Sequence, residues 1–147
     1  MANRLPVESF SFPVEQIKAG YYTDAYFLRS AEILNGDNYH PRVLMQIFAR
    51  DNVVVCGTDE VIALLKTCAF HPENIVIHSL HDGDEVEEWE TVMTIEGVYQ
   101  DFAHLETIYL GILARQSRIA TNVRKVVKAA NGKPVLFFPA RYDIYQT

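Results

Sequence analysis

Apolar residues recur at three- and four-residue steps in three segments, which is the spacing of one helix face. The segments are 23–35, 59–70 and 101–130. Thr23 and Thr58 stand where a hydroxyl can cap the first and second helix, and Gly36 and Asn131 stand where the first and third end. The pattern therefore predicts two amphipathic helices followed by a long helical region. Gly111, inside that region, indicates close packing against another backbone.

Shorter apolar runs between the helices predict strands. Val43–Ala49 and Val53–Cys56 are separated by the turn pair Asp51-Asn52, so we expect them to form a hairpin. Residues 75–100 hold further short strands around a turn at His81–Asp84. The first twenty residues are expected to be irregular and to place aromatic rings in the core.

The continuous apolar run Val135–Phe138 follows a helix, which is typical of a parallel strand covered on both faces. A buried strand needs partners beside it. This one either joins the first sheet or begins a new α/β unit, and we expect the second arrangement. The expected organisation is an N-terminal α/β domain over 1–100, connecting helices over 101–131 and the incomplete start of an α/β barrel domain over 132–147.

The composition narrows the range of functions. The chain has 147 residues, of which 49% are hydrophobic, and a net charge of −6, so no basic surface for nucleic acid is expected. No apolar run approaches the roughly 20 residues that cross a membrane. Cys56 and Cys68 have neither disulfide nor zinc spacing and are expected to be core thiols of a cytoplasmic protein. The acidic residues between Asp82 and Glu90 are expected to form a solvated hairpin.

Three groups of residues could carry chemistry. His78, His81 and His104 could contribute to a metal site, but exposed turn histidines fit their spacing better. The segment 21–27, with its tyrosines and one aspartate, is either a helix start with core anchors or a ring-stacking wall beside a carboxylate. The segment 115–121, with arginines and hydroxyls, is either a solvated helix face or a phosphate site.

Three short motifs occur in a distinctive order. They are Thr23-Asp24-Ala25-Tyr26-Phe27, then Glu106-Thr107 with Ser117-Arg118-Ile119-Ala120-Thr121, and then Phe138-Pro139-Ala140-Arg141. Together they resemble the N-terminal part of nicotinate phosphoribosyltransferases of the archaeal and bacterial type, from about residue 15 onward. The resemblance implies an α+β N-terminal domain, an α/β sandwich with barrel-like hairpins, followed by the first strand of an irregular α/β barrel.

The resemblance also implies chemistry. Nicotinate and phosphoribosyl pyrophosphate would give nicotinate mononucleotide and pyrophosphate, with ATP hydrolysis, in NAD biosynthesis. The transition state of such a transfer should resemble an oxocarbenium ion, and Mg²⁺ would neutralise phosphate charge. A homo-oligomer, a dimer or larger, is implied because the two rings that sandwich the pyridine come from different subunits.

The resemblance implies four substrate-binding residues in this chain. Tyr26 and Phe138 would stack on the pyridine ring, Asp24 would lie near the ring and the ribose, and Arg141 would bind a carboxylate or phosphate. Arg118 and Thr121 are possible phosphate contacts. No residue is assigned to catalysis or to metal binding.

Some residues depart from the family pattern, so its phosphate contacts do not carry over unchanged. Pro139 and Arg118 replace glycines, and Tyr142 replaces a second arginine. Thr107 stands where quinolinate phosphoribosyltransferases have an arginine, which favours nicotinate. A quinolinate enzyme and a non-catalytic oligomerisation module derived from the family are the alternatives. Because phosphate loops belong to later barrel strands, we expect the chain alone to be inactive. We also expect weak self-association, because the aromatic sandwich and the apolar helix face around Gly111 need a partner.

Overall fold

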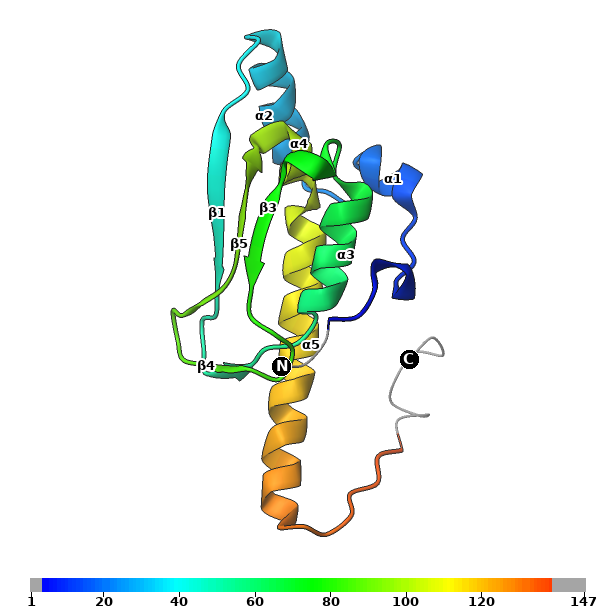
Figure 1. Ribbon diagram of the computed structural model, residues 1–147, viewed down its shortest axis with the longest axis vertical. Helices are drawn as coiled ribbons and strands as arrows, with labels where there is room; N and C mark the ends of the chain where they lie inside the picture. The colour runs from blue at the N-terminus through cyan, green and yellow to red at the C-terminus, as the bar shows by residue number, and fades with distance from the viewer. Residues whose placement is uncertain (1–3, 139–147) are drawn as a thin grey trace.

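The computed structural model describes residues 4–138, and its core is an antiparallel sheet with helices against one face (Figure 1). Three strands form this sheet in the order β1-β5-β3, namely Arg42–Phe48, Thr91–Val98 and Val76–Ser79. A second sheet pairs β2 (Val53–Val54) with β4 (Glu85–Val86). The predicted α+β class is confirmed, and the expected barrel is not shown.

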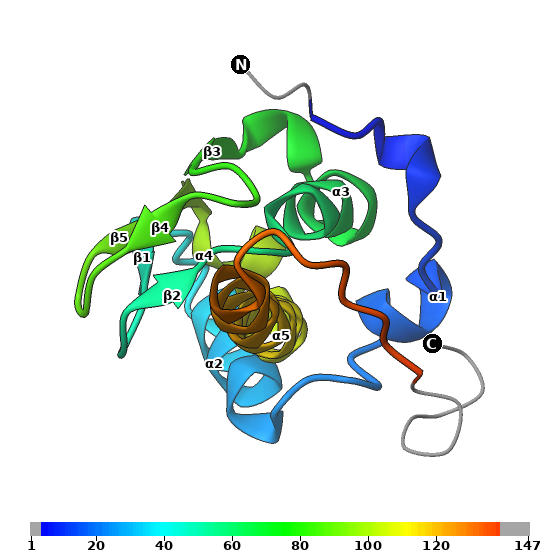
Figure 2. The same cartoon turned by 90° about the horizontal axis from the view of Figure 1, so that it is seen from below.

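Helices α3 and α5 cover the inner face of the sheet, and the helices of the described residues are five in all. They are α1 (Val14–Lys18), α2 (Ala25–Gly36), α3 (Thr58–Cys68), α4 (Tyr99–Phe102) and α5 (Glu106–Ala130), with 3-10 turns η1 (Val7–Ser9), η2 (Pro72–Asn74) and η3 (Ala103–Leu105). Helices α3 and α5 lie side by side, and the last turns of α5 extend beyond the sheet (Figures 1 and 2). The three predicted helical segments are confirmed, whereas the first twenty residues are more regular than expected.

The strands pair differently from the prediction. β1 pairs antiparallel with β5, and β2 pairs with β4, so the expected hairpin of β1 and β2 is wrong. The reason is that the two runs fill different cores: Ile47 packs in the main cluster under α3 and α5, whereas Val55 packs with Val86 and Val92 in a smaller one. The acidic residues between Asp82 and Glu90 are exposed as predicted. They form no hairpin, because β4 inside this segment pairs with β2, and β5 after it pairs with β1 and β3.

A bulge allows β5 to contribute side chains to both hydrophobic clusters. Ile47 stands opposite Met93 and Phe48 stands opposite Thr91, which leaves Val92 as the extra residue. Val92 and Met93 are both buried although they are neighbours in the strand. Met93 belongs to the main cluster and Val92 to the smaller one.

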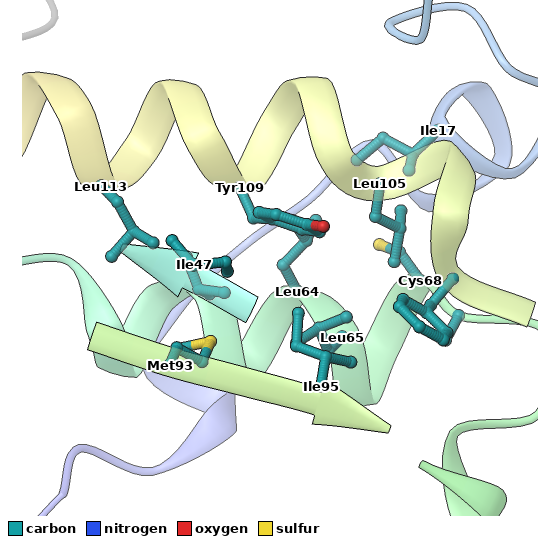
Figure 3. Close-up of a cluster of buried hydrophobic side chains, with 13 residues drawn as sticks. Ile17, Ile47, Leu64, Leu65, Cys68, Met93, Ile95, Leu105, Tyr109 and Leu113 are labelled. Atoms are coloured by element: carbon teal, nitrogen blue, oxygen red, sulfur yellow. The ribbon is translucent and has the colours of Figure 1, made fainter. Parts of the chain in front are cut away.

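The main core lies between α3, α5 and the inner face of the sheet. Figure 3 shows Tyr109 of α5 beside Leu64 and Leu65 of α3, with Ile95 of β5 across from them. Cys68 is fully buried here, as predicted, whereas Cys56 is half-buried with its Sγ 3.7 Å from a carboxylate oxygen of Asp82. Burial raises the pKa of both thiols.

Helix α3 begins under a carboxylate from a distant turn. Asp82 accepts hydrogen bonds from the N–H groups of Gly57 (3.0 Å) and Thr58 (2.8 Å) and from the Thr58 hydroxyl (2.7 Å). Gly57 has φ of 96°, and a Cβ there would stand 3.0 Å from Ile112 and Gln116. The predicted cap by Thr58 is wrong, because the Thr58 hydroxyl donates to Asp82 rather than capping the helix itself.

Two expectations about the helices are wrong. The apolar stripe expected on α2 is largely exposed: Ile33 is 65% exposed, and Phe27 is the buried residue of this helix. A Cβ added to Gly111 would meet no described atom within 4 Å, so Gly111 makes no close backbone contact in residues 4–138.

The run 133–138 forms no strand. A strand requires a hydrogen-bonded neighbour, and within the described residues no edge strand of either sheet pairs with this run. The side chains of this run are exposed, with Phe138 at 78%. The strand expected at Val135–Phe138 is therefore not present.

The histidines form no metal site in the part of the chain that the structure describes, since no three His, Cys, Asp or Glu side chains there could hold an ion. His78 and His81 are exposed as predicted, but His104 is buried against Phe70, with ring centroids 4.7 Å apart. Burial lowers the pKa of His104. Among residues 4–138 no helix is long and apolar enough to span a membrane.

His71 is expected to make stability depend on pH. Its Nδ1 lies 2.7 Å from Oδ1 of the buried Asp101, and this hydrogen bond and the carboxylate charge raise the pKa of His71. The pair therefore stabilises the fold below the unfolded pKa of about 6.5, and this contribution is lost as pH rises through the higher folded pKa. His71→Gln should lower the unfolding free energy more at about pH 5.5 than at about pH 9.

Urea unfolding at the two pH values measures this difference. His78→Gln serves as the control, because His78 is an exposed histidine on β3. An equal loss for His71→Gln at both pH values would show that the ion pair does not act in the folded state.

Candidate functional site

The N-terminal ends of α2 and α5 meet at Asp24 and Thr107. The Thr107 hydroxyl donates to Oδ2 of Asp24 (2.9 Å) and accepts from the Asp24 N–H (3.3 Å). This pair joins residues that are 83 positions apart in the chain. Asp24 is also the N-cap residue of α2, so its carboxylate lies at a helix end that favours negative charge. Two of the three motifs are therefore brought together.

Tyr26 presents an aromatic face at this junction. Its ring lies 4.2 Å from the ring of Phe27, centroid to centroid, and Phe27 is 5% exposed, so the pair is anchored in the domain. The Tyr26 side chain is 55% exposed. Desolvation, followed by the charges of Glu106 and Asp24, raises the pKa of Tyr26. Its hydroxyl therefore keeps its proton at neutral pH, and the exposed ring is uncharged.

Glu106 adds a second carboxyl group that sequence reasoning did not name as a site residue. It lies in the first turn of α5 beside Thr107. Desolvation, followed by the charge of Asp24, raises the pKa of Glu106. No lysine or arginine of the described residues acts on the pKa of Tyr26 or Glu106. The junction is therefore aromatic and acidic. The Glu106-Thr107 motif was the signal in the sequence from which Glu106 could have been predicted.

Ser117 and Thr121 use their hydroxyls to hold the chain that follows β1. Ser117 Oγ accepts from the Cys56 N–H (3.0 Å) and donates to the Cys56 carbonyl (3.2 Å). Thr121 Oγ1 accepts from the Val54 N–H (2.9 Å) and donates to the Ser117 carbonyl (2.6 Å). The single O–H donor of Thr121 is therefore already engaged, which leaves none for the predicted phosphate contact.

Arg118 faces a cleft between α5 and the loop after β1. The cleft has a volume of about 1000 Å³ and its polar lining includes Arg50, Asn122 and Lys125. The lining also includes the carboxylates of Asp51 and Glu88, so its charge is mixed. An anion would have to bind beside the guanidinium and ammonium groups, which come from two elements. The role of Arg118 in phosphate binding stays a prediction, now with a cleft in which it could act.

The two regions are separate. Thr107 and Arg118 are eleven positions apart in α5, which is about 16 Å along a helix axis. One pyridine ring at Tyr26 therefore cannot contact Arg118 as well. Of the other predicted site residues, Phe138 is exposed and has no partner ring among residues 4–138, and Arg141, with Pro139 and Tyr142, lies outside the described residues.

Comparison with protein families identifies the domain. The family model described as quinolinate phosphoribosyl transferase, N-terminal domain, matches residues 24–117. The chain belongs to this family. The match begins at the N-cap of α2 and ends within α5, so it contains Asp24, Tyr26 and Thr107. The resemblance to phosphoribosyltransferases is confirmed, although the matching family is the quinolinate one.

The family domain is similar to parts of longer solved structures. Nicotinate-nucleotide pyrophosphorylase from Pyrococcus furiosus is 32% identical with a TM-score of 0.79, over 93% of this chain and 36% of that one. The protein of the same name from Ehrlichia chaffeensis is 20% identical with a TM-score of 0.58, over 73% and 42%. Human nicotinic acid phosphoribosyltransferase is 15% identical with a TM-score of 0.65, over 78% and 30%, so these last two share the fold. The chain spans less than half the length of each.

Proposed function

We propose that this domain is the N-terminal part of a pyridine-carboxylate phosphoribosyltransferase of NAD biosynthesis. In this reaction the pyridine nitrogen attacks the anomeric carbon of phosphoribosyl pyrophosphate, and pyrophosphate leaves. The observation that carries the proposal is the junction of Asp24, Tyr26 and Thr107, which lies within the matched family segment. The family membership and the relative from Pyrococcus furiosus support the same reaction class.

The Tyr26 ring would orient the pyridine substrate. A flat ring gains by stacking on an exposed aromatic face, and the anchored Phe27 keeps that face in place. Fixing the ring plane fixes the direction of the nitrogen lone pair, which is the geometric requirement of the transfer. Asp24, held by Thr107, would lie beside the ring and the ribose. Phe138 and Arg141 are proposed to complete the site from a second subunit.

The family match supports quinolinate as the substrate. The matching family model is named for quinolinate phosphoribosyl transferase. Mg²⁺ would neutralise the phosphates, and we propose that its ligands come from outside this chain.

Nicotinate is the second candidate substrate, and the charge of the junction favours it. Asp24 and Glu106 lie near Tyr26, and Thr107 supplies no positive charge. Quinolinate carries one more carboxylate than nicotinate, and an added negative charge at about 4 Å from another costs about 1 kcal/mol in water. ATP hydrolysis would accompany the nicotinate reaction.

A pyrophosphate-release assay tests the proposal. The polypeptide encoded by the complete reading frame is given phosphoribosyl pyrophosphate, Mg²⁺ and either quinolinate or nicotinate, with and without ATP. Turnover of either pyridine acid supports the reaction class, and the better substrate decides between the candidates. No release with either would favour a non-catalytic oligomerisation module. The 147-residue chain alone is expected to be inactive.

Tyr26→Ala should raise the KM for the pyridine substrate about tenfold, because ring stacking contributes about 1–3 kcal/mol. The KM for phosphoribosyl pyrophosphate should change little, since that substrate has no aromatic ring. Tyr39→Ala is the control, because Tyr39 is similarly exposed and lies after the C-terminal end of α2. Equal KM changes in both variants, measured by steady-state kinetics, would remove Tyr26 from the site.

A further inference from the structure

Two aromatic rings lie exposed on the outer side of the main sheet. Phe48 ends β1 and Trp89 lies in the turn before β5; their ring centroids are 5.3 Å apart at an interplanar angle of 35°. Trp89 is 61% exposed and Phe48 is 41% exposed. Leu44, which shares the outer face of β1 with Phe48, is 65% exposed. Helices α3 and α5 cover the opposite face of the sheet, and Phe48 also lines the cleft beside α5.

The backbone holds the indole in place. Trp89 has φ of 71°, a left-handed conformation that is rare for a bulky residue and normally taken by glycine. The turn is tied to the end of β1 by hydrogen bonds from the Trp89 N–H to the Ala49 carbonyl (2.7 Å) and from the Ala49 N–H to the Glu90 carbonyl (3.1 Å). A large apolar side chain is thus displayed to solvent at a position where the backbone favours a glycine.

Glutamates flank Trp89 in the sequence of this turn. Glu87, Glu88 and Glu90 are exposed, and within the described residues none of them forms an ion pair. The N–H of Glu88 donates to Asn52 Oδ1 (3.0 Å), and the N–H of Glu87 donates to the carboxylate of Glu90 (2.7 Å), so the backbone bearing these charges is fixed. Arg50 lines the same cleft as Glu88 and is the nearby cation.

We propose that the surface formed by Phe48, Trp89, Glu87 and Glu88 docks an arginine side chain of a partner protein. The guanidinium would stack on the indole face and pair with a flanking carboxylate. Arginine suits this surface better than lysine, because its planar, weakly hydrated group stacks on aromatic rings while its N–H groups bond to carboxylates. The flanking negative charge repels phosphate-bearing partners such as nucleic acids.

Trp89 is the only tryptophan of the chain, so its fluorescence reports on this surface alone. The test titrates the protein with the blocked peptide Gly-Arg-Gly and with the peptide in which neutral citrulline replaces arginine. The arginine peptide should change the emission with about three- to tenfold higher affinity, as expected for a cation over an indole beside carboxylates. High salt should remove most of that difference.

Two double variants distinguish binding at this surface from a general effect of the protein's net charge. Glu87→Gln with Glu88→Gln should abolish the preference for arginine while leaving Trp89 as the reporter. Glu15→Gln with Glu32→Gln removes the same charge from exposed positions on α1 and α2 and should leave the preference intact.

Three results would overturn the proposal. One is an equal response to the arginine and citrulline peptides, and another is the absence of any response to the arginine peptide at millimolar concentration. The third is a change in Trp89 emission when the protein alone is diluted, together with a change from dimer to monomer in sedimentation. This result would mean that a second copy of the chain binds this surface.

Discussion

Replacing Phe102 by alanine is expected to lower the free energy of unfolding by about 3–5 kcal/mol. Phe102 is fully buried in the main cluster. Its ring lies against Gly97 of β5, where an added Cβ would stand 3.3 Å from ring atom Cε1. Removing the ring leaves a cavity between the sheet and the turns that lead into α5, and these rigid elements cannot close on it. Urea unfolding followed by circular dichroism measures the loss.

Phe137→Ala is the matched control for Phe102→Ala. Phe137 is 81% exposed, so its replacement should change stability by no more than about 0.5 kcal/mol. Similar losses in the two variants would mean that Phe102 is not packed as the structure has it.

Replacing Asp82 by alanine is expected to cost about 2–3 kcal/mol, although this residue is on the surface. The carboxylate accepts two backbone N–H groups at the start of α3 and the hydroxyl of Thr58, which is fully buried. Alanine would leave these donors without an acceptor, and the charge that favours the helix N-terminus would be lost. Equilibrium urea unfolding is again the measurement.

Two further variants resolve the contribution of Asp82. Asp82→Asn keeps an acceptor oxygen and loses the charge. It should therefore lower the free energy of unfolding by less than Asp82→Ala does. Asp51→Ala removes a carboxylate from an exposed loop residue and should change stability by no more than about 0.5 kcal/mol. A neutral Asp82→Ala would show that α3 does not depend on this cap.

The helices could be predicted from the sequence because their signals are local. The apolar period of α3 and the stop at Asn131-Gly132 lie within a few residues of the backbone they specify. The strand partners could not be predicted in this way. β1 and β2 have a suitable turn between them, but β1 pairs with β5 because only β5 brings Met93 and Ile95 into the core that Ile47 also fills. That choice depends on packing across the whole domain.

The candidate site was predicted in part. The family resemblance singled out Asp24 and Tyr26. The structure joins Asp24 to Thr107, a contact that no sequence pattern specifies, and the charges of Asp24 and Glu106 act on Tyr26. Whether these residues bind substrate stays a prediction. Thr121 was proposed from residue type and from the family motif, and neither reveals that its hydroxyl is engaged with Val54 and Ser117. Arg141 lies outside the described residues.

The pairing of β1 with β5 also matters while the chain is being synthesised. β1 ends at Phe48 and its partner strand ends at Val98, so 50 more residues must be made before β1 can be completed. At translation rates of about 5–20 residues per second, this interval is roughly 3–10 s. During that time Leu44, Ile47 and Phe48 lie on an unpaired strand, and a chaperone that binds short apolar segments would find its target there before the domain closes.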